Sequence, residues 1–420
     1  MARLEDDGHQ AWCVGGAVRD ALLGHPHLDW DLATDARPDD VRRLFGRKRT
    51  IPVGIDFGTV GVLDSDGVMH EVTTFRHDVR TDGRHAEVEF GASLDEDLAR
   101  RDFTVNAIAF SPSRREVRDP FGGQRDLKSR VIRAVGDAQQ RMREDRLRAL
   151  RAMRFAARYQ FTIDPDTWQA IRDSAPYLTR LSAERVKQEL EKTMDQVDHP
   201  SRALRMWRET GAASVLLPEL ASASEEALVA VDLSAQPGSP RRPGRRLNRI
   251  AALLSDVDGT RALDVAGRLR FSNQDARWLS DLLERWRVLD EEMSAALRTG
   301  EPDSGVVRHW VARIGRVYLP AFYRLADARW SARRTAAHDA PTAQAVHSLY
   351  RRSVRAALRD PVDLRDLAID GDDLRRAGIP PGPGMGKILS TLLSWVIEEP
   401  ARNLRDRLLD EARRLHARQH

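Results

Sequence analysis

Residues 15–31 constrain this chain more than any other segment, because a glycine pair, an arginine and two carboxylates follow one another within seventeen residues. Gly15 and Gly16 predict a turn into a helix, where backbone N–H groups can approach a phosphate, and Arg19 projects from the first turns of that helix. Asp29 and Asp31 are one residue apart on an extended segment, so their side chains point to the same side of a strand. The segment predicts a phosphate cradle beside a carboxylate pair.

The carboxylate pair predicts a metal site. Two close carboxylates repel each other and need a neutralising cation, and hard oxygen ligands suit Mg²⁺. A phosphate cradle next to a metal pair is typical of phosphoryl or nucleotidyl transfer. A lone Gly-Gly is usually a strand-to-helix turn and a lone Asp-x-Asp a solvated turn, but their order within an apolar frame favours the functional interpretation. A Walker A loop is excluded, because no Gly-Lys-Ser/Thr follows.

The composition is that of an ordinary globular protein with many charges. The 420 residues are 41% hydrophobic and 31% charged, a length that allows about two to four domains. No apolar run reaches membrane-spanning length, so we expect no membrane partner, and the first residues do not resemble a signal peptide. The single cysteine, Cys13, excludes disulfides and cysteine-based zinc sites. We therefore expect a reducing, cytoplasmic compartment.

Hydrophobic periodicity divides the chain into an α+β part and a helical part. The expected strands cover residues 12–14, 60–63, 69–74, 104–110 and 131–135, and helices are expected at 17–23 and 38–46. From residue 137 the pattern becomes helical, and residues 139–159 predict a single amphipathic helix. Stretches rich in Pro, Gly and Ser at 236–245 and 301–305 indicate linkers or exposed loops.

Clusters of arginine indicate a polyanionic partner. Residues 141–158 contain seven arginines against Glu144 and Asp145, and the last twenty residues contain six more. Guanidinium groups pair bidentately with phosphate, so such clusters suit a polyanion. Solvated helix faces with local acidic partners explain any single cluster equally well.

Glu71 is a third candidate carboxylate. It lies in the alternating segment 69–75, which predicts a strand that could lie beside the strand of Asp29 and Asp31. A carboxylate there would hold a second metal ion or activate an attacking hydroxyl. An exposed strand glutamate is an equally good interpretation.

Residues 100–107, which read Arg-Arg-Asp-Phe-Thr-Val-Asn-Ala, offer further nucleotide-binding groups. Arg101 would clamp a triphosphate, Asp102 would orient a neighbouring arginine or a sugar hydroxyl, and Asn106 would bond a ribose. Taken alone, the segment would be interpreted as a surface turn leading into a strand.

A helical stripe further along the chain predicts base recognition. Asp145, Arg148 and Arg151 are spaced by three, and Arg154 continues the series. Asp145 would accept from the exocyclic amino group of C or A while Arg148 donates to the adjacent ring acceptor, and G and U, which carry a carbonyl there, would be rejected. Arg151 and Arg154 would buttress the pair or reach phosphate. A salt-bridged helix face is the simpler alternative.

Taken in order, these motifs resemble those of the class II tRNA nucleotidyltransferases, which comprise the bacterial CCA-adding enzymes and their poly(A) polymerase relatives. The matching segments lie at residues 15–24, 29–34, 100–108, 144–155, 181–190 and 374–386. The resemblance implies a DNA polymerase β-like catalytic head over residues 1–136. A helical neck (137–200), body (201–300) and tail (301–420) would follow.

The resemblance also implies a reaction, the template-independent addition of C and A to the 3′ end of tRNA. The enzyme would use CTP and ATP and release pyrophosphate. Asp29 and Asp31 would bind Mg²⁺, and Gly16, Arg19 and Arg101 would hold the triphosphate. Asp145 and Arg148 would select the base, supported by Arg151 and Arg154. The basic helical half would bind the acceptor arm by charge and shape.

Several activities share this framework. Residues 75–86 are polar and contain glycine, and they resemble the flexible loop of full and A-adding members, which argues against a CC-only enzyme. A-only addition, polyadenylation and a non-catalytic RNA-binding role on the same scaffold stay open as alternatives.

A phosphohydrolase domain with paired histidines occurs in some members. Here Ser255 precedes Asp256 where such a domain would need histidine, and the dipeptide His338-Asp339 stands alone. We expect no metal site in the body, which would act as a scaffold and RNA contact.

Overall fold

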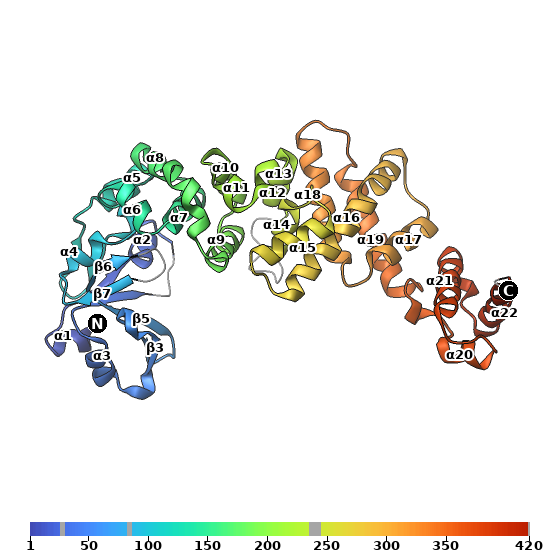
Figure 1. Cartoon of the computed structure of the whole chain (residues 1–420), viewed down its shortest axis with the longest axis horizontal. Coiled ribbons are helices and arrows are strands. Elements are labelled where there is room, and N and C mark those ends of the chain that lie inside the picture. Colours follow the sequence, from blue (N-terminus) through green and yellow to red (C-terminus); the bar gives the residue numbers. More distant parts are fainter. Residues whose placement is uncertain (26–29, 82–85, 235–244, 419–420) are drawn as a thin grey trace. The chain divides into compact units, whose positions relative to one another are not determined.

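The chain folds into an N-terminal unit, Met1–Ala221, and a C-terminal unit, Ser222–His420 (Figure 1). The computed structural model describes residues 1–25, 30–81, 86–234 and 245–418. Strands occur in the N-terminal unit, whereas the described part of the C-terminal unit is helical. The predicted order of an α+β part followed by helices is confirmed, and the four-part division at residues 136, 200 and 300 stays a prediction.

A seven-stranded sheet forms the centre of the N-terminal unit. Its strand order is β3 (Thr50–Gly54), β4 (Thr59–Leu63), β5 (Met69–Thr74), β2 (Asp31–Thr34), β1 (Ala11–Val14), β8 (Ala109–Ser111) and β9 (Glu116–Arg118). Strands β2 and β5 pair in parallel, with Leu32 opposite Val72, and the other neighbours pair antiparallel. The strands expected at residues 12–14, 60–63 and 69–74 are confirmed.

Helices surround this sheet and continue beyond it. Those of the N-terminal unit are α1 (Ala2–Asp6), α2 (Gly16–Leu22), α3 (Pro38–Phe45), α4 (Leu94–Ala99), α5 (Gly123–Ser129), α6 (Ala138–Glu144), α7 (Leu147–Tyr159), α8 (Pro165–Ser174), α9 (Ala183–Gln196), α10 (Pro200–Glu209), α11 (Ala212–Leu216) and α12 (Pro218–Ser222). The 3₁₀ helices are η1 (Arg47–Arg49), η2 (Ile55–Phe57), η3 (Thr104–Asn106) and η4 (Ala175–Arg180).

The two faces of the sheet are covered differently. Val60, Val62 and Val72 point to one face, where they are buried with apolar residues of α1 and α3. Because side chains alternate along a strand, the neighbours of these valines point to the other face. On that face, Trp12 packs toward α4, whereas Glu71 and its neighbours in β4 and β5 face a pocket. The sheet therefore leaves part of one face accessible for function.

Residues 75–86, predicted as a flexible loop, belong instead to a hairpin for most of their length. Strands β6 (Arg76–Thr81) and β7 (Ala86–Phe90) pair antiparallel, with Arg76 opposite Phe90. The pairing satisfies backbone N–H and C=O groups that a loop would leave to water. Residues 82–85 lie outside the described part of the chain.

Two predicted strands are shorter than expected. The strand expected over 104–110 begins with the 3₁₀ turn η3, where Thr104 Oγ1 donates to Asp126 Oδ2 at 2.7 Å, and only residues 109–110 belong to a strand. The expected strand 131–135 shortens to β10 (Val131–Ile132), which pairs with β11 (Thr162–Ile163). Both differences depend on partners distant in the sequence.

The helix predicted over 139–159 is two helices, α6 and α7, separated at Asp145. Asp145 has an extended backbone, and its carboxylate accepts from the backbone N–H of Leu147 at 3.0 Å. Aspartate side chains offer the backbone this alternative to helical hydrogen bonding. The prediction of a continuous helical stripe through Asp145 is therefore wrong, because Asp145 lies before the start of α7.

The C-terminal unit is built around aromatic side chains. Its helices are α13 (Glu225–Leu233), α14 (Arg245–Leu253), α15 (Gly259–Arg268), α16 (Asn273–Thr299), α17 (Ser304–Ile314), α18 (Leu319–Thr335), α19 (Ala343–Arg359), α20 (Gly371–Arg376), α21 (Pro383–Glu398) and α22 (Arg405–Ala417), with 3₁₀ turns η5 (Leu364–Asp366) and η6 (Pro400–Arg402). Trp286 of α16 lies with its ring centroid 6.2 Å from that of Phe322 and 6.0 Å from that of Trp330, both in α18. Within the described residues, no helix is long and apolar enough to cross a membrane.

Two glycines of α15 test the packing of this unit. A Cβ at Gly259 would lie 2.6 Å from the backbone oxygen of Ser280, whereas a Cβ at Gly267 would meet nothing within 4 Å. We expect Gly259→Ala to lower the free energy of unfolding by about 1–3 kcal/mol, because backbone must shift. Gly267→Ala should be neutral or stabilising by up to about 1 kcal/mol, because alanine favours a helix. Urea unfolding followed by circular dichroism measures both, and equal effects would contradict the packing.

Candidate functional site

A pocket of about 450 Å³ lies on the accessible face of the sheet, between β2, β5, α2, η3 and α7. It brings together many of the predicted site residues, namely Gly15, Gly16, Arg19, Asp31, Glu71, Arg101, Asp102, Asn106 and Arg151. The sequence therefore identified groups from segments more than 130 residues apart that line a single cavity. Asp29 lies outside the described residues.

Two carboxylates lie at the same level of adjacent strands. Asp31 begins β2 and Glu71 belongs to β5, and the parallel pairing of Leu32 with Val72 places the two residues next to each other. Both line the pocket. The predicted strand neighbourhood is confirmed for Asp31 and Glu71, and oxygen ligands of this kind suit a hard divalent cation.

Gly15 keeps the space above these carboxylates open. Its φ of 72° lies in the region that favours glycine. A Cβ at this position would lie 2.8 Å from Nη1 of Arg101 and 4.0 Å from Oδ2 of Asp31. A side chain here would occupy the space between a guanidinium and a carboxylate, which is where a phosphate and its metal ion would fit.

Asp97 of α4, which sequence reasoning missed, positions Arg101. Arg101 Nη2 donates to Asp97 Oδ2 at 3.2 Å, and Arg100 Nε donates to Asp97 Oδ1 at 3.0 Å. Burial of Asp97 opposes its ionisation, yet the two guanidinium groups hold its pKa below the ordinary value. Arg100 and Arg101 follow Asp97 by three and four residues, and this spacing is the signal that could have revealed the two ion pairs.

Asp102 joins α7 to the floor of the pocket. Arg151 donates to Asp102 Oδ2 from Nε at 2.9 Å and from Nη2 at 2.8 Å, and Asn106 Nδ2 donates to Asp102 Oδ1 at 2.8 Å. Burial opposes ionisation of Asp102, but Arg151 and the Asn106 bond hold its pKa below the ordinary value. The carboxylate of Asp102 is thus engaged by protein groups, including the neighbouring arginine that the sequence predicted it to orient.

Arg19 is held more tightly than the sequence predicted. It is only 4% exposed, donates from Nε to Asp20 at 2.8 Å and from Nη1 to Asn106 Oδ1, and lies over the ring of Tyr159 at 4.7 Å. Tyr159 in turn donates to Asp20 Oδ1 at 2.8 Å. Burial raises the pKa of the Tyr159 hydroxyl to about 12, so it remains a donor at neutral pH. Arg19 forms part of the pocket wall and does not project freely.

Three predicted base-selecting or supporting residues are not among the side chains that line this pocket. Asp145 Oδ2 accepts from Arg185 Nη2 at 2.7 Å, and Arg148 Nη1 donates to Glu144 at 2.7 Å. Arg154 is buried in an ion pair with Glu189. The break before α7 separates Asp145 from the helical spacing that predicted its pairing with Arg148.

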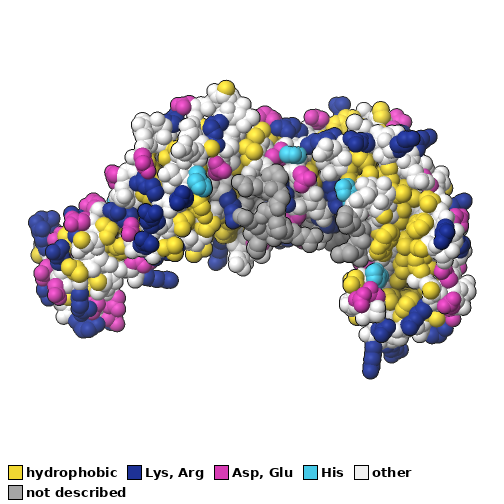
Figure 2. Space-filling view, turned by 180° about the vertical axis from the view of Figure 1, so that it is seen from behind, with side chains coloured by type: hydrophobic (Ala, Val, Ile, Leu, Met, Phe, Trp, Pro, Cys, Tyr) yellow, Lys and Arg dark blue, Asp and Glu magenta, His cyan; other side chains and the backbone are white. Residues whose placement is uncertain are grey.

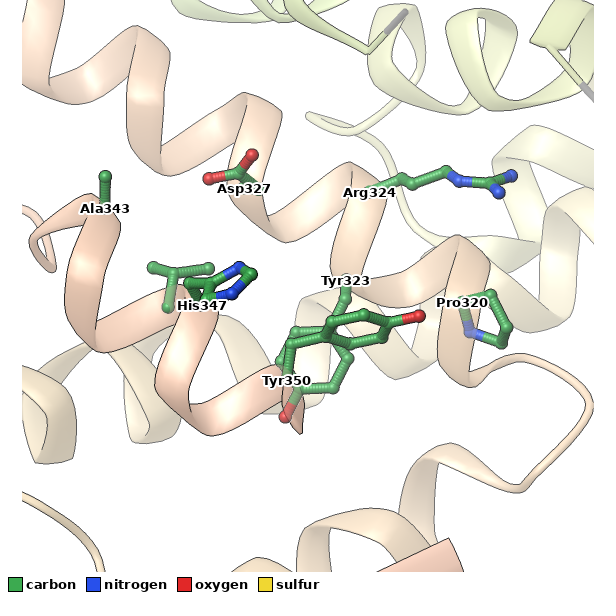
Figure 3. Close-up of a pocket in the computed structure, with 8 residues that line it drawn as sticks. Pro320, Tyr323, Arg324, Asp327, Ala343, His347 and Tyr350 are labelled. Carbon is green, nitrogen blue, oxygen red and sulfur yellow. The ribbon is translucent and has the colours of Figure 1, made fainter. Parts of the chain in front are cut away.

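The C-terminal unit contains a further cavity of about 470 Å³ between α18 and α19 (Figure 3). The ring centroids of Tyr323 and Tyr350 lie 5.3 Å apart there. Its lining contains none of the predicted site residues. Elsewhere in this unit, Asp256 pairs with Arg329 at 2.9 Å and His338 contacts Glu226 at 2.5 Å, so both groups are engaged by side chains of other segments.

Comparison with known proteins decides the family. Residues 11–133 match the family described as the poly A polymerase head domain, and residues 160–224 match a probable RNA- and SrmB-binding site of polymerase A. The CCA-adding enzyme of Lactiplantibacillus plantarum is 35% identical over 98% of this chain and 93% of its own length. That of Geobacillus kaustophilus is 36% identical over 99% and 96%. The chain belongs to the CCA-adding enzyme family.

The fold of this CCA-adding family member agrees with that assignment. The crystal structure of the Bacillus stearothermophilus CCA-adding enzyme in complex with CTP matches with a TM-score of 0.77 and 32% identity, covering 100% of this chain and 96% of that one. The predicted nucleotidyltransferase head followed by helices is confirmed, and the chain is a tRNA nucleotidyltransferase.

The ion pair of Asp102 with Arg151 generates a pH-dependent prediction. Asp102→Asn should lower the free energy of unfolding at pH 7 by about 2–4 kcal/mol, because Arg151 loses its counter-charge. The folded pKa of Asp102 is lowered below an unfolded value of about 3.9, so the stabilisation exists above that pH and is lost as the pH falls through the folded pKa. The difference between wild type and variant should therefore narrow below about pH 4.

Urea unfolding at pH 7 and pH 3 measures this difference. The matched control is Asp95→Asn, which breaks an exposed pair with Arg118 and should cost little at either pH. A loss for Asp102→Asn that does not exceed the control, or that does not change with pH, would contradict the assigned ion pair.

Proposed function

We propose that this chain adds C and A to the 3′ end of tRNA, using CTP and ATP. Each addition forms a bond between the 3′ oxygen of the RNA and the α-phosphorus, and breaks the bond from that phosphorus to the oxygen leading to the β-phosphate, releasing pyrophosphate. The observation that carries the proposal is the pocket that places Asp31 and Glu71 beside the guanidinium groups of Arg19, Arg101 and Arg151, in a chain of the CCA-adding family.

We propose Mg²⁺ as the cofactor. Asp31 and Glu71, together with Asp29, would hold it, since their carboxylate oxygens are the donors that this ion prefers. Bound Mg²⁺ would neutralise charge on the triphosphate and lower the pKa of the attacking hydroxyl. Glu71 would also accept the proton of that hydroxyl.

The cationic wall would bind the triphosphate. Arg101, fixed by Asp97, and Arg19, fixed by Asp20 and Tyr159, would donate to phosphate oxygens. Gly15 and Gly16 would allow the phosphates to approach the backbone. Asp102 and Asn106 would act as positioning residues, because their polar atoms hold Arg151 and Arg19.

Asp145 and Arg148 would read the base edge. Their present partners, Arg185 and Glu144, would be exchanged for the amino group and ring acceptor of C or A. Arg154, buried against Glu189, would support α7 from behind. The helical remainder of the chain would contact the acceptor arm through its clustered arginines.

We further propose that the enzyme works in a reducing cytoplasm. Cys13 is free and buried. Burial raises the pKa of its thiol to about 11, which keeps the thiol protonated and unreactive.

Incubation with three RNA ends tests the activity. Transcripts of tRNA that end at the discriminator base, at C or at CC are offered with labelled CTP or ATP. We expect C on the first two ends and A on the CC end. ATP incorporation on the CC end with no CTP incorporation on the other two ends would instead indicate an A-adding enzyme, and long A tails would indicate a poly(A) polymerase. No incorporation on any end would leave only a non-catalytic RNA-binding role.

Two variants separate chemistry from base choice. Asp31→Ala should abolish incorporation, because a metal ligand is lost. Asp145→Ala should keep measurable transfer while it relaxes the preference for C and A over G and U, because the acceptor for the amino group is removed. Incorporation assays with all four nucleotides measure both effects, and full selectivity in Asp145→Ala would contradict the base-reading assignment.

A further inference from the structure

An exposed apolar strip continues the catalytic face of the sheet toward its β3 edge. It consists of Ile51 and Val53 in β3 and Met69 in β5, which are 42%, 46% and 38% exposed. The register places Ile51 opposite Gly61 and Gly61 opposite Glu71. Because residues paired across strands point to the same face, the strip and the catalytic carboxylate share one surface.

Gly61 makes the centre of the strip flat. A Cβ there would lie 2.9 Å from both Met69 Sδ and Val53 Cγ2, so these two side chains close over the glycine. The flanking Val60 and Val62 point to the buried face and hold the strand in place. The result is a continuous apolar floor next to a catalytic centre. Contiguous exposed apolar surface of this kind is typical of a site that a ligand covers.

Three cations border the apolar strip. Arg47, Lys48 and Arg49 form η1 immediately before β3, and all three are exposed. Their side chains form no ion pair or hydrogen bond with any residue in the described ranges. In Figure 2 the head lies at the right, and hydrophobic side chains gather there above a lower tip that carries Lys and Arg side chains. Exposed cations beside an apolar floor fit a ligand that has both phosphates and flat apolar faces.

The strip and the guanidinium groups of the pocket lie on opposite sides of the carboxylates, so the strip would contact the RNA and not the triphosphate. The pocket guanidinium groups of Arg19, Arg101 and Arg151 lie on the β1, η3 and α7 side of Asp31 and Glu71. The strip lies on the opposite side, across β4 and β3. Neighbouring strands are about 4.8 Å apart, so the floor reaches about 10 Å beyond Glu71. Stacked nucleotides rise about 3.4 Å each, so this distance accommodates about three of them.

We propose that this strip and the η1 cations bind the last nucleotides of the RNA acceptor strand. Bases and riboses would lie on Ile51, Val53 and Met69, and the phosphates would meet Lys48 and Arg49. The contacts involve no base edge, so they would hold C-ended and CC-ended RNA alike while the 3′ hydroxyl faces Glu71. This inference rests on the proposed nucleotidyl transfer to RNA.

The apolar contact is tested with Val53→Asp. Its matched control is Val117→Asp on β9, the opposite edge strand of the same sheet, where the valine is 41% exposed. With a tRNA transcript ending in CC as probe, we expect Val53→Asp to raise the KM for RNA at least tenfold and leave the KM for ATP within twofold. Val117→Asp should leave both unchanged.

The cationic contact is tested with the double variant Lys48→Gln, Arg49→Gln. Its control, Arg125→Gln, Lys128→Gln in α5, removes the same charge from another exposed surface. Each phosphate contact to a single strand contributes about 0.7 to the slope of log Kd against log salt, so the first variant should lower the slope by about 1.4. This binding readout does not depend on activity and remains if Val53→Asp fails to fold.

The outcomes separate the two proposals. A wild-type chain that adds no nucleotide to any RNA end contradicts the proposed function. An active wild type whose strip and η1 variants behave as their controls do overturns the present inference alone. A rise in the KM for ATP equal to that for RNA would also overturn it, because the strip would then belong to the nucleotide site.

Discussion

A chain of paired polar side chains ties helix α7 to helix α2 and to the segment of η3, and the geometry of the nucleotide pocket depends on it. Arg151 of α7 binds Asp102, Asp102 binds Asn106, and Asn106 binds Arg19. Arg19 also binds Asp20, which accepts a hydrogen bond from Tyr159 of α7. Charges that leave water are costly unless they are paired, so each member fixes the next in one arrangement. The wall of the pocket is therefore organised before any substrate arrives, as electrostatic catalysis requires.

The alternation of side chains along β4 and β5 leaves one face of the sheet accessible to both a triphosphate and an RNA end. The valines of β4 and β5 are buried on one face of the sheet. Because side chains alternate along a strand, Glu71, Gly61 and their neighbours lie on the other, accessible face. Arginines lie on one side of the carboxylates, and an apolar floor lies on the other side. A triphosphate and an RNA end would thus approach Asp31 and Glu71 from different directions, which is the geometry that transfer between them needs.

Sequence reasoning found the motif residues and the strand alternation, and missed side-chain bonds that periodicity does not register. The alternation of residues 69–74 predicts the strand of Glu71, and the parallel pairing of that strand with β2 places Glu71 beside Asp31. The same reasoning extended a helix through Asp145, because periodicity does not register the bonds of that carboxylate to Leu147 and Arg185. It also missed Asp97 and Tyr159. Asp97 carried a spacing signal, but in the sequence alone neither residue differs from an ordinary helix residue that holds no arginine.

We propose that a single pocket on the sheet binds either CTP or ATP, one at a time. Filter binding of labelled ATP with Mg²⁺, competed by CTP, measures it directly, with Arg101→Ala as the site variant in which Asp97 keeps Arg100 as a partner. We expect one site per chain, full mutual exclusion of CTP and ATP, and loss of the binding of both nucleotides in Arg101→Ala. Two independent sites, or undiminished binding in the variant, would contradict it.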